Sequence, residues 1–202
     1  IADYICGFAK EHGLWYRKDE ANNVIVKRPG SKGHEDDPAL ILQGHTDMVC
    51  VKLPDCKHDF DKDPIELEIK DGWLTAKGTT LGADDGIAVA YMLAFLAKED
   101  LVCPPLECIF TSMEEIGLLG AAALDTSDIS GRMMINMDGG ASEDHMSVVS
   151  SAGGQVYDFY RTPTFEAAHG DVLSLTIRGL LGGHSAIVID QGRGNALKLM
   201  AR

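Results

Sequence analysis

The hydrophobic residues of this chain gather in short uninterrupted runs that alternate with stretches of helical repeat. Three of the runs have the length of a strand and few polar positions: Ala39 to Gln43, Leu106 to Thr111 and Met133 to Met137. Such runs are typical of core strands that are covered on both faces. Gly86 to Lys98 instead repeats its apolar residues at helical spacing. We therefore predict an α/β fold, in which a mixed β-sheet is sandwiched by helices.

Shorter elements are predicted around this core from the same patterns. They are a helix from Ile1 that ends near Gly13, a helix at Ile116–Leu124, a strand at Val24–Lys27, and a hairpin made by Ile65–Ile69 and Trp73–Ala76. The hairpin is indicated by Asp71-Gly72, because an Asp-Gly pair between two strand patterns favours a tight turn.

The character of the chain changes near residue 153. Val156 to Tyr160 and Leu173 to Arg178 alternate like strands, a glycine-rich loop spans Gly179 to Ser185, and a helical pattern covers about Gln191 to Arg202. We predict one domain over residues 1–153 and the beginning of a second, α+β domain over residues 154–202.

Composition narrows the possible partners. The 202 residues are 45% hydrophobic and 24% charged, which is ordinary for a globular protein. The formal net charge of -13 disfavours nucleic acid and anionic membranes as partners, because both would be repelled. Metal ions and small cationic or zwitterionic substrates are better tolerated.

The five cysteines include no C-x-x-C pair, which argues against a disulfide framework and against a zinc ribbon. The chain shows neither a secretory leader nor an apolar run of about 20 residues, the length of a membrane span. We therefore expect a cytoplasmic protein with reduced thiols and no membrane contact.

Four polar islands follow predicted strands or precede a predicted helix: His45-Thr46-Asp47, Asp84-Asp85, Glu114-Glu115 and Asp138. The carboxyl ends of the strands of an α/β sheet form the usual position of a site. Imidazole and carboxylate are ligands for divalent cations, and one carboxylate can bridge two of them. Together the islands predict a metal-assisted hydrolase.

Each island also has a simpler explanation. His45 and Asp47 are two apart on extended backbone, so the carboxylate can accept the second imidazole N–H, but a surface pair would look the same. Asp84 could be a helix cap. On extended backbone, Glu114 and Glu115 would face opposite ways, so that one could bind metal and the other could transfer a proton. They could equally be two solvated acids in a loop. Asp138 could be a turn carboxylate.

Longer stretches of the sequence resemble one peptidase family. The stretches His45-Thr46-Asp47, Gly78 to Gly86, Thr111 to Ala121 and Gly182-Gly183-His184-Ser185 are similar to the M20 metallopeptidases, in particular the aminoacyl-histidine (Xaa-His) dipeptidases. The resemblance covers essentially the whole chain. It implies a catalytic metallopeptidase domain over residues 1–153, and over residues 154–202 the start of a lid and dimerisation domain through which a homodimer could form.

The resemblance also implies roles for particular residues. His45 and Asp138 would hold one zinc ion, Asp84 would bridge two, and Glu115 would bind the second, with cobalt or manganese as other ions that this ligand set accepts. Asp47 would orient its metal-ligand neighbour, and Glu114 would be the general base. His184 would stabilise the oxyanion, although a loop histidine in a glycine-rich turn is the simpler reading.

The resemblance further implies a cis peptide bond between Asp84 and Asp85. The second zinc of the family takes a further histidine that has no counterpart before Arg202, since the context of His169 does not match. We therefore expect the His45 metal to be held better than the Glu115 metal.

The predicted function is hydrolysis of short peptides, with Xaa-His dipeptides as the expected substrates. Another M20 hydrolase, such as a tripeptidase or an N-acyl amino acid deacylase, is the first alternative. The tripeptidase pattern favours a lysine after the paired aspartates, where this chain has Gly86. A truncated member that binds metal without turnover is the second alternative.

Overall fold

The computed structural model describes residues 1–139, 160–167, 169–183 and 190–202. The chain divides into two units, Ile1–Val149 and Ser150–Arg202. The predicted domain boundary at residues 153 and 154 lies outside the described residues and stays a prediction.

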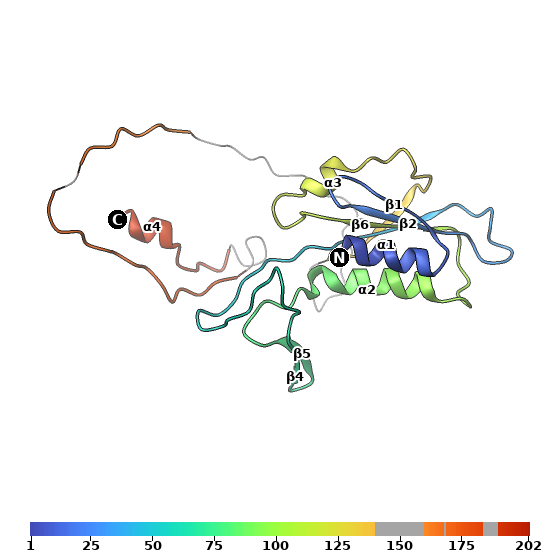
Figure 1. Ribbon diagram of the computed structural model, residues 1–202, viewed down its shortest axis with the longest axis horizontal. Helices are drawn as coiled ribbons and strands as arrows, with labels where there is room; N and C mark the ends of the chain where they lie inside the picture. Colours follow the sequence, from blue (N-terminus) through green and yellow to red (C-terminus); the bar gives the residue numbers. More distant parts are fainter. Residues whose placement is uncertain (140–159, 168, 184–189) are drawn as a thin grey trace. The chain divides into compact units, whose positions relative to one another are not determined.

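A five-stranded mixed sheet forms the centre of the first unit (Figure 1). Its strands, in spatial order, are β1 (Trp15–Lys18), β2 (Val24–Arg28), β6 (Leu106–Thr111), β3 (Leu40–His45) and β7 (Met133–Asn136). The β3 strand runs parallel to both β6 and β7, whereas β2 runs antiparallel to β1 and β6. The predicted mixed α/β architecture is confirmed.

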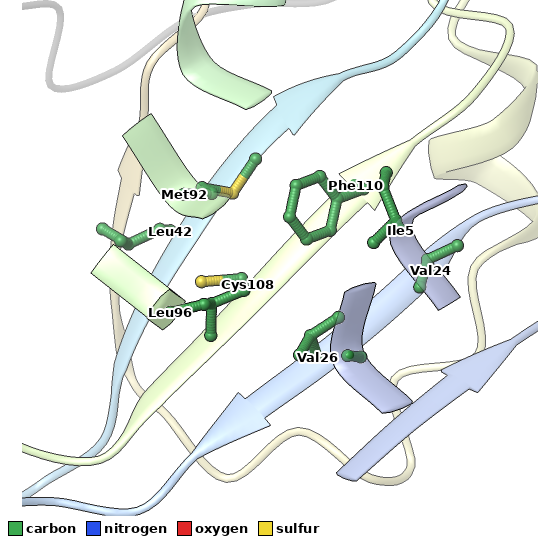
Figure 2. Close-up of a cluster of buried hydrophobic side chains, with 9 residues drawn as sticks. Ile5, Val24, Val26, Leu42, Met92, Leu96, Cys108 and Phe110 are labelled. Atoms are coloured by element: carbon green, nitrogen blue, oxygen red, sulfur yellow. The ribbon is translucent and has the colours of Figure 1, made fainter. Parts of the chain in front are cut away.

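Two helices, α1 (Ala2–Glu11) and α2 (Ala83–Ala97), cover one face of this sheet (Figure 1). The main core lies beneath them (Figure 2). It is formed by the buried side chains Ile5, Ala9, Val24, Val26, Leu42, Met92, Leu96, Cys108 and Phe110. Because side chains alternate along a strand, Ile25, Ile41 and Ile109 point to the opposite face and form a smaller cluster there.

A short helix, α3 (Leu119–Ala123), precedes the loop whose Leu124 and Ile129 pack against this smaller cluster. The helix is shorter than the predicted Ile116–Leu124, because Gly117 and Leu118 have positive φ angles of 111° and 60° that a right-handed helix excludes.

Two further strand predictions have different outcomes, and one strand was not predicted. The hairpin is confirmed as β4 (Leu67–Lys70) paired with β5 (Trp73–Ala76). The β7 strand forms at the predicted place, but its residues are exposed, so the prediction of a core strand was wrong. Its position at the edge of the sheet explains this, because a neighbouring strand lies on one side only. The β1 strand was not predicted, since its sequence Trp-Tyr-Arg-Lys lacks an apolar alternation.

In the second unit the described residues contain one helix, α4 (Ala196–Met200), inside the predicted range Gln191–Arg202. Leu173–Arg178 is not a strand, so that prediction was wrong; the described residues offer it no pairing partner. Most of the predicted strand Val156–Tyr160 lies outside the described residues. None of the helices in the described part of the chain has the length and apolar content that a bilayer crossing requires.

The register of the parallel strands determines where the polar islands meet. His45 lies opposite Thr111, and Gln43 lies opposite Asn136. The strands β3, β6 and β7 therefore end at the same edge of the sheet, and the segments that follow them start side by side.

Candidate metal centre

The polar islands converge at this edge. Ligand atoms of His45, Asp84 and Asp138 lie within 4.8 Å of one another, and so do those of His45, Glu114 and Glu115. His45 ends β3, Asp84 lies at the start of α2, the two glutamates follow β6, and Asp138 follows β7. The five predicted metal and base residues thus meet in two groups that share one imidazole.

The His45 ring is buried and has an acceptor at each nitrogen. Its Nδ1 lies 3.0 Å from the backbone carbonyl of Asp47, and its Nε2 lies 3.0 Å from Oδ1 of Asp84 and 3.9 Å from Oε2 of Glu114. A neutral imidazole can donate from one nitrogen only. Donation from Nδ1 to the carbonyl leaves the Nε2 lone pair directed toward the carboxylates, where a cation would replace the second proton.

The Asp47 carboxylate does not make the predicted hydrogen bond with the second imidazole N–H, and its role in orienting His45 stays a prediction. The carboxylate lies 3.6 Å from Nδ1 of His45, and instead accepts the backbone N–H groups of Glu114 and Glu115 at 3.0 and 3.1 Å. Nδ1 of the imidazole contacts the backbone carbonyl of Asp47, which lies nearer to the ring than the carboxylate does. The Asp47 side chain therefore connects the end of β3 to the glutamate loop.

Asp84 is not a helix cap. The N-cap of α2 is Gly82, and Asp84 has the extended angles φ -86° and ψ 105°. The Asp84–Asp85 peptide bond is cis, as the family resemblance implied. Asp84 is exposed, so the cluster is open to solvent.

Asp85 supports the end of β3 beside the cluster, a role that its sequence context did not predict. Its side chain is buried, and Oδ2 accepts the backbone N–H of His45 at 3.1 Å. A Cβ at Gly44 would lie 2.5 Å from this oxygen, so the approach requires glycine. An acid before a helix of small residues resembles a cap in the sequence, and the contact with β3 appears only in the fold.

Glu114 and Glu115 do not point in opposite directions, as extended backbone would require. Met113 has a positive φ of 52°, and the carbonyl of Glu114 accepts the N–H groups of Gly117 and Leu118, both at 2.9 Å. The chain therefore turns at this point, and both carboxylates approach His45.

The charges of the cluster perturb its titration. Burial alone would lower the pKa of His45, but the hydrogen bond with Asp84 and the charge of Asp138 outweigh it and raise that pKa. Burial raises the pKa of Glu114, and the neighbouring carboxylates of Asp138 and Glu115 add to the increase. Burial likewise raises the pKa of Asp85 to about 6, against the hydrogen bond from His45.

A bound cation fits these observations. Among the described residues, no lysine or arginine forms an ion pair with Asp84, Glu114 or Asp138. Several carboxylates at a protein edge without a cationic side chain are unfavourable unless a cation from solution compensates them. One imidazole with several carboxylates is a donor set for zinc, manganese or cobalt.

A pocket of about 490 Å³ adjoins the cluster on the sheet face opposite α1 and α2. Glu114 and Asp138 lie on its polar side, and Ile41, Ile109 and Leu118 contribute to its apolar wall. Small-molecule sites combine such a wall with few polar groups. The predicted oxyanion residue His184 lies outside the described residues, so its role stays a prediction.

Comparison with known proteins agrees with a peptidase. The cytosol non-specific dipeptidase of Escherichia coli is 41% identical over the whole chain, which spans 42% of that protein's length. The crystal structure of aminoacylhistidine dipeptidase from Vibrio alginolyticus is 43% identical and matches with a TM-score of 0.66, over 68% of this chain and 28% of that one. A tripeptidase from Staphylococcus aureus, 24% identical over 69% of this chain and 37% of that one, shares the fold with a TM-score of 0.56.

The family model that matches is described as peptidase family M28 and covers residues 23–175, more than half of the chain. It contains all the candidate residues that converge at the sheet edge. The M20 family is not named by these comparisons, so the finer assignment made from the motifs stays a prediction. The chain belongs to peptidase family M28.

Proposed function

We propose that this protein is a metal-dependent dipeptidase that uses two divalent cations, with zinc as the expected ion. The observation that carries the proposal is the convergence of His45, Asp84, Asp138 and the two glutamates at one edge of the sheet, in a chain of a peptidase family. Because the chain spans less than half of its dipeptidase relatives, the activity of the whole protein is part of the proposal.

Each residue has a defined task in this proposal. His45, Asp84 and Asp138 would hold one cation, and Asp84 and Glu115 would hold the second. When bound, the cations would polarise the scissile carbonyl and make a water molecule more acidic. Glu114 would accept a proton from that water and deliver it to the leaving amine, a task to which its raised pKa is suited. His184 would donate to the developing oxyanion.

The substrate is proposed to be a dipeptide with a carboxyl-terminal histidine, and the motifs are proposed to be those of the M20 metallopeptidases. The support is the named activity of the Vibrio alginolyticus relative together with Gly86 in place of a lysine. The Escherichia coli relative is named a non-specific dipeptidase, so a broader dipeptide range is the nearest alternative. We also propose a cytoplasmic location, which the name of that relative supports, and a homodimer formed through the second domain.

The proposal is tested with metal-free protein, zinc titration and a substrate panel. The panel contains an Xaa-His dipeptide, a dipeptide without histidine, a tripeptide and an N-acyl amino acid. We expect zinc-dependent release of free histidine, binding of two ions, and loss of hydrolysis by about 100-fold or more in Glu114→Gln with the first zinc retained. Binding of one ion without turnover would instead support a family member that binds metal without catalysis. Preference for the tripeptide or for the N-acyl amino acid would support another hydrolase.

A further inference from the structure

Asn23 is a fully buried polar residue far from the metal cluster in sequence. It precedes β2, which pairs with β6, and its side chain is 1% exposed. Its Oδ1 accepts the backbone N–H of Ser112 at 3.0 Å, and its Nδ2 donates to the carbonyl of Gly120 at 2.8 Å. The side chain thus contacts both ends of the segment 112–120, which carries Glu114 and Glu115.

The turn around Asn23 makes this contact specific. Asp19 accepts both the backbone N–H and the Nδ2 group of Asn23, at 2.8 and 2.7 Å, and so holds the amide in one orientation. The hydroxyl of Ser112 donates to the carbonyl of Ala21 at 2.5 Å. All hydrogen-bonding groups of the Asn23 side chain are therefore used, and two residues of the turn hold Ser112.

The two ends of the segment meet closely at Asn23. A Cβ at Gly120 would lie 2.0 Å from the carbonyl oxygen of Ser112 and 2.7 Å from Oδ1 of Asn23. The segment is a closed loop whose base is held by Asn23, whereas the carboxylate of Asp47 holds its top. Inside the loop, the Leu119 N–H donates to the Met113 carbonyl at 3.0 Å.

We propose that Asn23 is a positioning residue for Glu114, acting through the base of the 112–120 loop. The proposal rests on the proposed function, in which Glu114 is the general base. Asn23 is too deeply buried under the loop to touch a substrate, so its contribution is to keep the Glu114 carboxylate at a fixed place beside His45. A displacement of about 1 Å in a catalytic group can cost about 100-fold in rate.

The test compares two variants of the anchor with one matched control. Asn23→Ala removes the contacts to both ends of the loop, and Ser112→Ala removes only the hydroxyl contact to Ala21. The second variant keeps the proposal testable if the first does not fold. The control is Glu107→Gln, which disturbs another buried polar cluster on β6, at the opposite end of the strand. Amide hydrogen exchange and steady-state kinetics are measured on all four proteins with zinc.

We expect exchange of the 112–120 amides to rise about tenfold or more in Asn23→Ala, because each buried hydrogen bond that is lost costs about 1 kcal/mol, and less in Ser112→Ala. The kcat should fall by about 10-fold to 100-fold with KM little changed. The control should show neither change once folding is confirmed, because its substitution lies far from the loop.

Unchanged exchange of the 112–120 amides in both anchor variants would overturn the proposal. So would an equal fall of kcat in Glu107→Gln, because general destabilisation would then explain the effect. If the unsubstituted protein hydrolyses none of the peptides, the proposed function fails, and the exchange measurement alone decides whether Asn23 holds the loop.

Discussion

Strand β6 has a carboxylate near each end, and the two are held in opposite ways. At its amino end, Glu107 is surrounded by donors: Lys27 Nζ lies 2.9 Å away, and the N–H of Gly131 and the hydroxyl of Ser130 donate at 2.9 Å. Burial alone would raise the pKa of Glu107, but these hydrogen bonds lower it to about 2. The protein supplies all the positive charge that this carboxylate needs.

After the carboxyl end of β6, negative charge outweighs the positive groups that the described residues supply. Glu114 lies beside further carboxylates, its pKa is raised, and His45 is the ionisable partner that the described residues supply. The acid on β6, Glu107, thus has positively charged and hydrogen-bonding partners within the fold, whereas Glu114, in the segment after β6, lies among further carboxylates. The difference indicates that the cluster after β6 is built to receive a cation, whereas Glu107 stabilises the fold.

The largest expected effect comes from His45, which belongs to both groups of ligand atoms. His45→Ala should weaken zinc binding by more than about 100-fold. Loss of a hydrogen-bond partner of a metal ligand costs about 10-fold to 100-fold in affinity, and loss of the ligand itself should cost more. Zinc affinity is measured by calorimetric titration of metal-free protein. His34→Ala is the control, since His34 is an exposed histidine paired with Asp37. Equal affinity in the two variants would contradict a metal centre at this edge.

A smaller effect is expected at the other end of β6. Glu107→Gln keeps the shape of the side chain but loses charge-assisted hydrogen bonds, and should lower the free energy of unfolding by about 2 kcal/mol at neutral pH. Zinc affinity should stay unchanged, because the substitution lies away from the ligands. Denaturant unfolding and zinc titration of the same samples check both statements.

This effect also has a defined pH dependence. The pKa of Glu107 is about 2 in the folded protein and has its ordinary value near 4.5 in the unfolded chain. A lowered folded pKa contributes stability that is complete above about 4.5 and disappears as the pH falls toward 2. The difference between the unsubstituted protein and Glu107→Gln should shrink over this range. A constant difference from pH 7 to pH 2 would show that the charge of Glu107 contributes nothing.

The comparison also shows what could be predicted from sequence. The continuous apolar runs predicted β3 and β6, and with them the edge at which His45 and Glu114 meet, because a strand buried on both faces leaves little ambiguity. The edge strands were less readable: β7 was predicted as core and is exposed, and β1 was missed. The hydrophobic pattern of a segment predicts whether it is buried. It does not predict whether a strand lies at the edge of the sheet, because that depends on pairing with strands far along the chain.

The residues that hold the site in place were likewise not predictable from local sequence. The residues that converge at the sheet edge were predicted because their types have a recognisable chemistry. Asn23 and Asp85 were not, since an asparagine before a strand resembles a turn residue and an aspartate before a helix resembles a cap. Their contacts join residues 89 and 40 positions apart. Only the assembled sheet brings these partners together.

The smallest expected effect decides between two roles of Asp47. Asp47→Asn retains the backbone carbonyl that contacts Nδ1 of His45, but turns an amide NH₂ toward one of the two loop N–H groups that the carboxylate accepts. If the side chain holds the loop, amide hydrogen exchange at Glu114 and Glu115 should rise about tenfold, which corresponds to a loss of about 1.4 kcal/mol. Zinc affinity should then change by less than about tenfold. If it orients the imidazole instead, as the sequence predicted, zinc affinity should fall by about 10-fold to 100-fold with exchange unchanged. The 3.6 Å separation between the carboxylate and Nδ1 favours the first outcome, because it is longer than a hydrogen bond.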